Sequence, residues 1–208
     1  MSVKFQKIDK SPISEELAKI AELIYKAEEL HEENGIPPTT DFTQLFEDSK
    51  KGEPYFKLYL YFADKYSKFI SNVLREFAVV TNETRTEFIS ILLDDGNYLI
   101  LEGEEDKVTI PHPSAIASTH THPDVCLFSH KDLETADYLF IRNYLTVGVI
   151  SPYCLTLIYR KGVYTMEDKI ELEKLANKVK KSKRLEEVVK AYGETSFINL
   201  ALLSVRFV

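Results

Sequence analysis

The chain has 208 residues, 44% of them hydrophobic and 12% aromatic, which is enough apolar material to build a real core in one domain of medium size. The formal net charge is −7, so nonspecific nucleic-acid binding is not expected to be the main role. No apolar run approaches the roughly 20 residues that span a bilayer, and the N-terminus lacks the apolar core of a signal peptide.

The two cysteines, Cys126 and Cys154, do not amount to the disulfide framework of a small secreted protein. Together with the lack of a signal peptide, this pattern predicts a cytoplasmic protein whose cysteines are reduced. We expect no contact with membranes.

The first eighty residues are predicted to be helical. A helix should begin at Ser14, whose hydroxyl can cap it, because apolar residues then recur at spacings of three and four. Gly35 and the two prolines that follow should end this helix. A short helix is expected around 41–48, and aromatic residues at helical spacing predict a long helix over 55–77. We interpret residues 1–80 as a helical extension that either covers the sheet or receives a substrate or partner.

Short strands dominate the segment 81–165, which we interpret as the core domain. Strands are expected at 88–93, 98–101, 107–110, 116–119, 146–150 and 155–159. The turn at 94–97 contains Asp-Gly, which supplies the positive φ of a tight hairpin between the first two strands. A helix at 131–144 should lie between the fourth and fifth strands. This order predicts an α/β sandwich with an antiparallel or mixed sheet and flanking helices.

The last segment, 166–208, should combine a long charged helix with an apolar tail. The helix is expected over 166–192, with a break near Ser182. Five basic residues cluster near its middle: Lys178, Lys180, Lys181, Lys183 and Arg184. We interpret them as a solvated helix face, because acidic residues flank them, and the alternative is a site for an acidic partner. The apolar tail, 197–208, should pack on the helical extension as a strand or helix, or form a homodimer contact.

The least random stretch of the chain is 117–132, which holds three of its five histidines. Alternate residues of a strand point to one face, so His120 and His122 can bind one cation. Pro123 turns the chain into a loop that can bring Asp132 back to them. Two histidines and one carboxylate are the three protein ligands of a catalytic zinc, which keeps water in its fourth position. Zinc lowers the pKa of that water to about 7, which favours hydrolysis with a glutamate as the base.

Residues 120–123 read His-Thr-His-Pro and residues 129–132 read Ser-His-Lys-Asp. These stretches resemble the His-Ser/Thr-His-Pro and Ser-x-x-Asp signature of the JAMM (MPN-plus, JAB-domain) zinc metalloproteases. The resemblance covers about 87–160. It implies an MPN-like sandwich and a zinc-dependent enzyme that cuts the isopeptide or peptide bond after a ubiquitin-like protein, as deubiquitinases do.

The resemblance also implies a role for each residue of the site. His120, His122 and Asp132 would hold Zn²⁺. Glu87 stands before an apolar strand run, as the family's glutamate does, and would take a proton from the zinc-bound water. Ser129 would bind the oxyanion. The nearest rival to the base is a glutamate at position 83, which lies in a polar, turn-like stretch.

The sequence departs from the family pattern in the loop between His122 and Asp132. The loop is one residue shorter, and 125–128 replace the usual Gly and Pro residues, which changes the loop's shape and the placing of Ser129. Within the loop, Cys126 is a fourth ligand, a redox-sensitive thiol or a small buried residue. Ser-x-x-Asp also fits the cap of a helix, and both roles are compatible.

We predict a JAMM-type zinc hydrolase, and two alternatives stay open. The first is a catalytically inactive MPN-like scaffold that binds partners through its helical extension. The second, a His-x-His phosphoesterase or amidohydrolase, is weaker because such sites recruit more histidines and carboxylates for a second metal. The only other histidines here are His31, His112 and His130, of which His130 either replaces a ligand or faces solvent.

Overall fold

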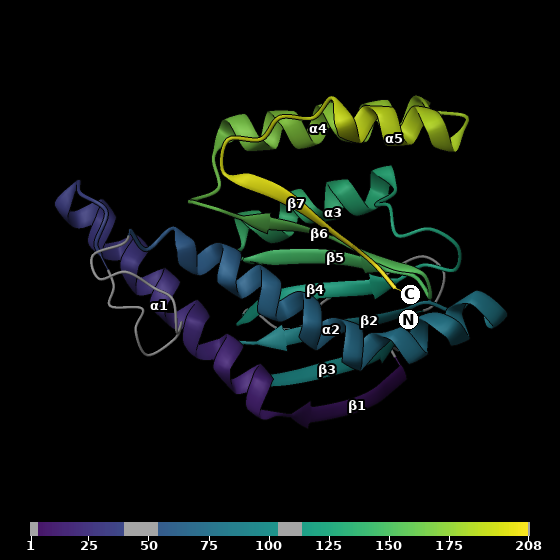
Figure 1. Cartoon of the computed structure of the whole chain (residues 1–208), viewed down its shortest axis with the longest axis horizontal. Helices are drawn as coiled ribbons and strands as arrows, with labels where there is room; N and C mark the ends of the chain where they lie inside the picture. Colours follow the sequence, from purple (N-terminus) through teal and green to yellow (C-terminus); the bar gives the residue numbers. More distant parts are fainter. Residues whose placement is uncertain (1–3, 40–53, 104–113, 208) are drawn as a thin grey trace.

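The computed structural model describes residues 4–39, 54–103 and 114–207, which form a sheet with helices on both faces (Figure 1). Its strands are β1 (Lys4–Lys10), β2 (Phe88–Leu93), β3 (Asn97–Glu102), β4 (Ala115–Thr121), β5 (Thr146–Ile150), β6 (Cys154–Arg160) and β7 (Leu200–Arg206). Its helices are α1 (Pro12–Asn34), α2 (Lys57–Thr84), α3 (His130–Ile141), α4 (Met166–Lys181) and α5 (Leu185–Gly193). Within these ranges the sheet has seven strands in the order β1-β3-β2-β4-β5-β6-β7.

The sheet is mixed. Strands β4 and β5 pair in parallel, and the other neighbouring pairs are antiparallel. The predicted α/β sandwich with a mixed sheet is therefore confirmed. The hairpin predicted around 94–97 joins β2 to β3, and Gly96 has the positive φ of 85° that its turn requires.

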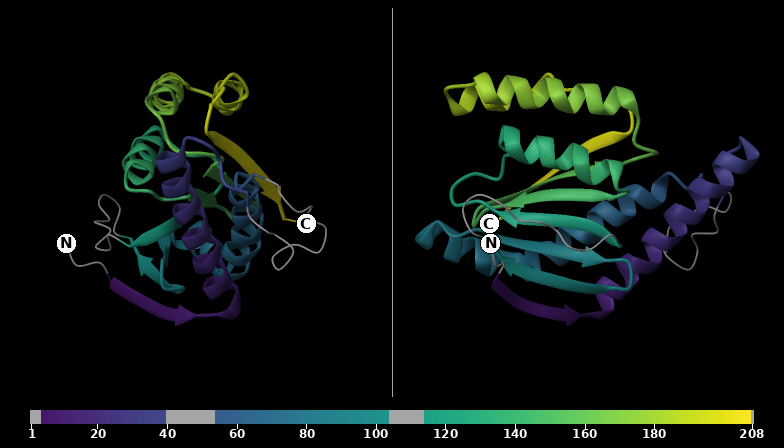
Figure 2. Two further views of the ribbon diagram at one scale, coloured as in Figure 1. Left: turned by 90° about the vertical axis from the view of Figure 1, so that its left-hand side faces the viewer. Right: turned by 180° about the vertical axis from the view of Figure 1, so that it is seen from behind.

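Successive strand residues point to opposite faces, which creates two cores. Leu92 and Tyr98 pack with α1 and α2, whereas Ile91 and Leu99 pack with α3, α4 and α5. Figure 2 shows α2 and α3 on opposite sides of the sheet. The aromatic-rich helix predicted over 55–77 is α2, whose buried face includes Tyr59, Phe62, Tyr66 and Phe69. Full burial of one such large apolar side chain stabilises a fold by about 1.5–3 kcal/mol.

The beginning of the chain differs from the predicted helical extension. Strand β1 pairs antiparallel with β3 and forms one edge of the sheet, with a register shift between Phe5 and Lys7. Such irregularities and lysine side chains are typical of edge strands. They interrupt the alternation of apolar and polar residues from which a strand is predicted. As a result, the ranges 1–80, 81–165 and 166–208 all contribute strands to the same sheet.

The first helix begins earlier than expected. Ser11 is its N-cap and Pro12 its first residue, while Ser14 closes a capping box by accepting the N–H of Ser11. Gly35 ends the helix at φ 69°, as predicted. The short helix expected at 41–48 and the strand expected at 107–110 lie outside the described residues.

The end of the chain follows its predictions. The charged helix breaks at Ser182, the C-cap of α4, and resumes as α5. The apolar tail forms β7, which pairs with β6, and its residues Leu203, Val205 and Phe207 pack against the core shared with α1 and α2. None of the helices in the described ranges combines the length and the apolar character needed to cross a bilayer.

Candidate metal centre

The two faces of β4 have different chemistry. Thr119 and Thr121 point toward α2, where their hydroxyls lie 2.9 Å from the Tyr66 hydroxyl and 2.6 Å from the Thr81 hydroxyl. His120, between them, therefore points to the opposite face, toward α3. The alternation predicted from the sequence is what separates the imidazole from the hydroxyls.

Helix α3 brings the carboxylate to this face. It is the crossover between the parallel strands β4 and β5, so its N-terminus lies near the carboxyl end of β4. Asp132 lies in its first turn. His122 follows β4 and donates its backbone N–H to the Ile150 carbonyl of β5 at 2.8 Å, which keeps the chain extended at this point.

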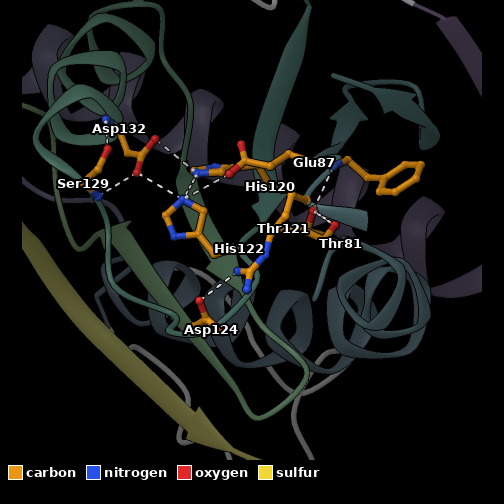
Figure 3. A network of polar contacts seen from close by, with 10 residues as sticks. Thr81, Glu87, His120, Thr121, His122, Asp124, Ser129 and Asp132 are labelled. Atoms are coloured by element: carbon orange, nitrogen blue, oxygen red, sulfur yellow. Dashed lines mark hydrogen bonds and ion pairs between the residues drawn. The ribbon is translucent and has the colours of Figure 1, made fainter. Parts of the chain in front are cut away.

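The three predicted ligands converge, as Figure 3 shows. The Nε2 atoms of His120 and His122 are 3.1 Å apart, and they lie 3.2 Å and 3.4 Å from Asp132 Oδ1 and Oδ2, respectively. Bonds of about 2.0–2.1 Å in a tetrahedral zinc site separate neighbouring ligand atoms by about 3.3 Å. The observed separations therefore fit one small cation held by all three side chains.

The electrostatics of the cluster favour a carboxylate beside the imidazoles. Burial, the largest single influence, raises the pKa of Asp132, but the charges and hydrogen bonds of His120 and His122 outweigh it and hold the pKa well below its usual range. Burial likewise lowers the pKa of His120, but Asp132 and the more distant Glu87 raise it above its ordinary value. Asp132 is therefore an anion over the physiological pH range, as a metal ligand must be.

Ser129 and Asp132 form the helix cap that their spacing predicts. The Ser129 hydroxyl accepts the N–H of Asp132 at 3.3 Å, and Asp132 Oδ2 accepts the N–H of Ser129 at 2.6 Å. This capping box fixes the first turn of α3 and, with it, the direction of the carboxylate. The candidate metal ligand is oriented by the same bonds that start the helix.

Glu87 precedes β2 and approaches the cluster from the side. Its carboxylate oxygen Oε1 lies 3.9 Å from His122 Nε2, and its side chain is 47% exposed. The pairing of Ile89 with His120 places the beginning of β2 beside the end of β4. The rival glutamate, Glu83, was expected in a polar, turn-like stretch, but it lies in the last helical turn of α2.

The loop between His122 and α3 is anchored at three points. Cys126 forms a disulfide with Cys154 at the start of β6. Tyr192 of α5 donates its hydroxyl to the Phe128 carbonyl at 3.0 Å, and Asp124 pairs with Arg85 at 2.9 Å. The loop is thus held by the disulfide, by α5 and by the ion pair between Asp124 and Arg85.

The disulfide corrects two expectations. The cysteines are not reduced, and Cys126 is neither a metal ligand nor a redox-sensitive free thiol. The sequence offered no local signal for this pairing, because the two cysteines are 28 residues apart and only the packing of the loop on β6 brings them together.

The other histidines lie apart from the cluster or outside the described residues. His130 is the first residue of α3 and does not replace a ligand in the cluster. His31 Nδ1 lies 3.2 Å from the Tyr55 hydroxyl, near the other end of α2. His112 lies outside the described ranges.

Sequence reasoning missed the residues behind and beside the cluster. Thr81 lies in α2 and contacts Thr121, which stands between the two histidines. Arg85 is the C-cap of α2 and contacts Asp124, in the loop after His122. The sequence could have indicated that Thr121 lies behind the site, because it stands between the two histidines and must point away from them. Nothing in the sequence indicated the contact of Thr81, since it is 40 residues distant in the chain.

The arrangement as a whole is a group of two imidazoles and one carboxylate that could bind a metal ion, with a second carboxylate beside it. Such a donor set suits zinc but also other divalent transition metals. The chain has no match among protein-family models, curated proteins or solved structures.

Proposed function

We propose that the protein is a zinc-dependent hydrolase of the JAMM type, which cleaves the isopeptide or peptide bond after a ubiquitin-like modifier. The observation that carries the proposal is the position of Glu87, whose carboxylate lies 3.9 Å from His122, beside the three ligand atoms. A base must be near the reacting water without binding the metal itself. The substrate class comes from the resemblance of residues 120–123 and 129–132 to the family signature.

His120, His122 and Asp132 would hold the zinc ion. When bound there, zinc supplies a Lewis acid that lowers the pKa of a water ligand and polarises a carbonyl oxygen. The spacing of the three ligand atoms, 3.1–3.4 Å, supports this assignment. The low pKa of Asp132 keeps its carboxylate charged and available.

Glu87 would move the proton. Its carboxylate accepts a proton from the attacking water and returns it to the amine that leaves when the amide bond breaks. Its partly exposed side chain suits this exchange, because the base must reach both the water and the substrate.

Ser129 would bind the developing oxyanion. Its hydroxyl oxygen accepts the N–H of Asp132 through a lone pair, and its own hydrogen can therefore donate to a substrate oxygen. The capping role and the oxyanion role use different parts of the same hydroxyl group.

Metal content tests the first half of the proposal. Protein purified without chelator should contain one zinc ion per chain, and His122→Ala should lose it. His130→Ala is the matched control, because this histidine is the first residue of α3 and lies outside the cluster. Bound iron in place of zinc, or no metal after zinc is added back, would refute the zinc hydrolase.

Substrate cleavage tests the second half. Glu87→Gln should abolish hydrolysis of fluorogenic C-terminal amides of ubiquitin-like proteins while leaving the zinc content unchanged. Glu83→Gln, on the nearby last turn of α2, is the control and should retain activity. Loss of zinc in Glu87→Gln would show that this residue is a ligand and not the base.

A catalytically inactive scaffold remains the rival. It would keep the fold, contain no stoichiometric zinc and cleave no amide of this class. Its helices α1 and α2 would then serve to bind a partner, which a pull-down with the wild-type chain would recover.

A further inference from the structure

A buried chain of hydroxyls lies behind the histidines, on the face of β4 opposite to the metal ligands (Figure 3). The backbone N–H of Phe88 donates to Thr121 Oγ1 at 2.8 Å, and Thr121 Oγ1 lies 2.6 Å from Thr81 Oγ1. Thr81 Oγ1 in turn donates to the Phe77 carbonyl of α2 at 3.0 Å. The side chains of Thr81 and Thr121 are fully buried, so water does not compete for these bonds.

The number of protons determines the direction of this chain. Each threonine hydroxyl has one hydrogen to donate. Thr81 uses its hydrogen on the Phe77 carbonyl, so the hydrogen between the two threonines must belong to Thr121. All three bonds therefore run one way, from the Phe88 N–H through Thr121 and Thr81 to the backbone of α2. Removal of either hydroxyl leaves a buried donor or acceptor without its partner.

The first donor belongs to the peptide group that follows the base. On one side of this peptide, the Glu87 carbonyl accepts the N–H of Gly103 at 2.7 Å. On the other side, the Phe88 N–H donates to Thr121. The peptide between Glu87 and Phe88 is thus held from both sides, by the residue after β3 and by β4.

A side chain makes this second contact, one residue beyond the last pair of the backbone ladder. The last paired residues of β2 and β4 are Ile89 and His120, and the next residue of β4 is Thr121, whose hydroxyl accepts the Phe88 N–H. The Thr121 hydroxyl extends the contact between β2 and β4 by one residue, to the point where Glu87 leaves the strand.

The Glu87 carboxylate has little else to hold it. Among the described residues, its carboxylate approaches His122 Nε2 at 3.9 Å, and its side chain is half-exposed. Its location therefore depends mainly on the backbone from which it projects.

We infer that Thr81 of α2, acting through Thr121, is a positioning residue that holds the Glu87 backbone beside the metal ligands. This inference rests on the proposed function and deepens it, since it assigns helix α2 a part in the catalytic apparatus. Neither threonine touches the substrate or the metal. Both act through the peptide bond that carries the base.

The test uses the full-length chain loaded with zinc. Thr81→Val keeps the size of the side chain and removes the hydroxyl, whereas Thr81→Ser keeps the hydroxyl. A displacement of about 1 Å at a reacting group can cost on the order of 100-fold in rate. We expect kcat to fall about 10- to 100-fold in Thr81→Val, with KM and zinc content unchanged, and to be largely restored in Thr81→Ser.

A second hydroxyl of the same helix gives the matched control. Ser71 also donates to the carbonyl four residues earlier, at 2.7 Å, but takes no part in the chain to Phe88. Ser71→Ala should leave kcat unchanged. A wild-type kcat in Thr81→Val, or an equal loss in Ser71→Ala, would overturn the inference.

Amide hydrogen exchange provides a readout that needs no activity. In the wild-type chain the Phe88 N–H should exchange slowly, and in Thr121→Val it should exchange faster, while Thr121→Ser restores protection. Fast exchange of the Phe88 N–H in the wild-type chain would refute the hydrogen bond to Thr121, even if the valine variants do not fold. If the wild-type chain cleaves no amide, the proposed function fails. The exchange rate then still decides whether Thr121 holds the peptide between Glu87 and Phe88.

Discussion

Asp132 Oδ2 accepts the backbone N–H of Ser129 at 2.6 Å and lies 3.4 Å from His122 Nε2. One carboxylate oxygen therefore belongs both to the start of α3 and to the candidate metal centre. Because the two roles use different properties of the residue, one substitution should weaken metal binding and another should weaken the helix.

Asp132→Asn should reduce zinc affinity with little effect on the helix. The amide oxygen can still accept the N–H of Ser129, but the negative charge is lost. We therefore expect zinc affinity to fall by at least about 100-fold, the upper end of what is lost when a residue that only hydrogen-bonds to a metal ligand is changed. Ser129→Ala should do the opposite, with a loss of about 1 kcal/mol in the free energy of unfolding and a retained zinc ion. Zinc titration and urea denaturation of both variants test this separation, and equal zinc affinities in the two variants would contradict it.

The stability of the metal-free protein should depend on pH through His120 and Asp132. Because the pKa of Asp132 is lowered in the folded state, its contribution is present above its unfolded value of about 3.9 and is lost as the pH falls. Because the pKa of His120 is raised, its contribution is present below about 6.5 and is lost as the pH rises through the folded value. The pair should therefore stabilise the chain most between about pH 4 and 6.5.

Denaturation in the presence of chelator, measured at several pH values, tests this prediction. Asp132→Asn is the control, because it removes the carboxylate that raises the pKa of His120. A wild-type profile that overlays the profile of this variant would contradict the assigned coupling.

Reduction of the disulfide should destabilise the fold. Cys126 and Cys154 close a loop with a sequence separation of 28, for which the chain-entropy account predicts a contribution of about 3.5 kcal/mol. Urea denaturation with and without a thiol reductant measures this contribution. The double variant Cys126→Ser/Cys154→Ser should be as unstable as the reduced chain and insensitive to the reductant. Equal stability of the oxidised and reduced chains would show that the disulfide does not contribute.

The buried ion pair between Glu28 of α1 and Arg160 of β6 should be costly to break from one side. The Arg160 side chain is 1% exposed and that of Glu28 is 15% exposed, and Tyr59 also donates to Glu28. Glu28→Leu leaves the guanidinium buried without its counter-charge, so we expect a loss of about 3–5 kcal/mol.

The double variant Glu28→Leu/Arg160→Met removes both charges and should recover most of this loss, because two apolar side chains of similar volume replace the pair. Denaturation of the single and double variants gives the coupling. A double variant no more stable than Glu28→Leu would contradict the account.

Local patterns in the sequence were sufficient for much of the fold. The capping residues Ser129 and Asp132, the stop at Gly35 and the break at Ser182 were all predicted, because each depends on neighbours within one or two helical turns. The strand β1 was missed, since an edge strand with a register shift lacks a clear alternation.

The shared face of His120 and His122 follows from the sequence, because alternation along an extended chain is a property of the backbone. The sequence also predicts that Asp132 lies in the first turn of a helix. The tertiary structure alone decided what meets these residues. The register of β2 on β4 places Glu87 beside His122, and the packing of α2 brings Thr81 to Thr121. Contacts between segments about 40 residues apart depend on which faces bury against each other, and local periodicity does not encode that choice.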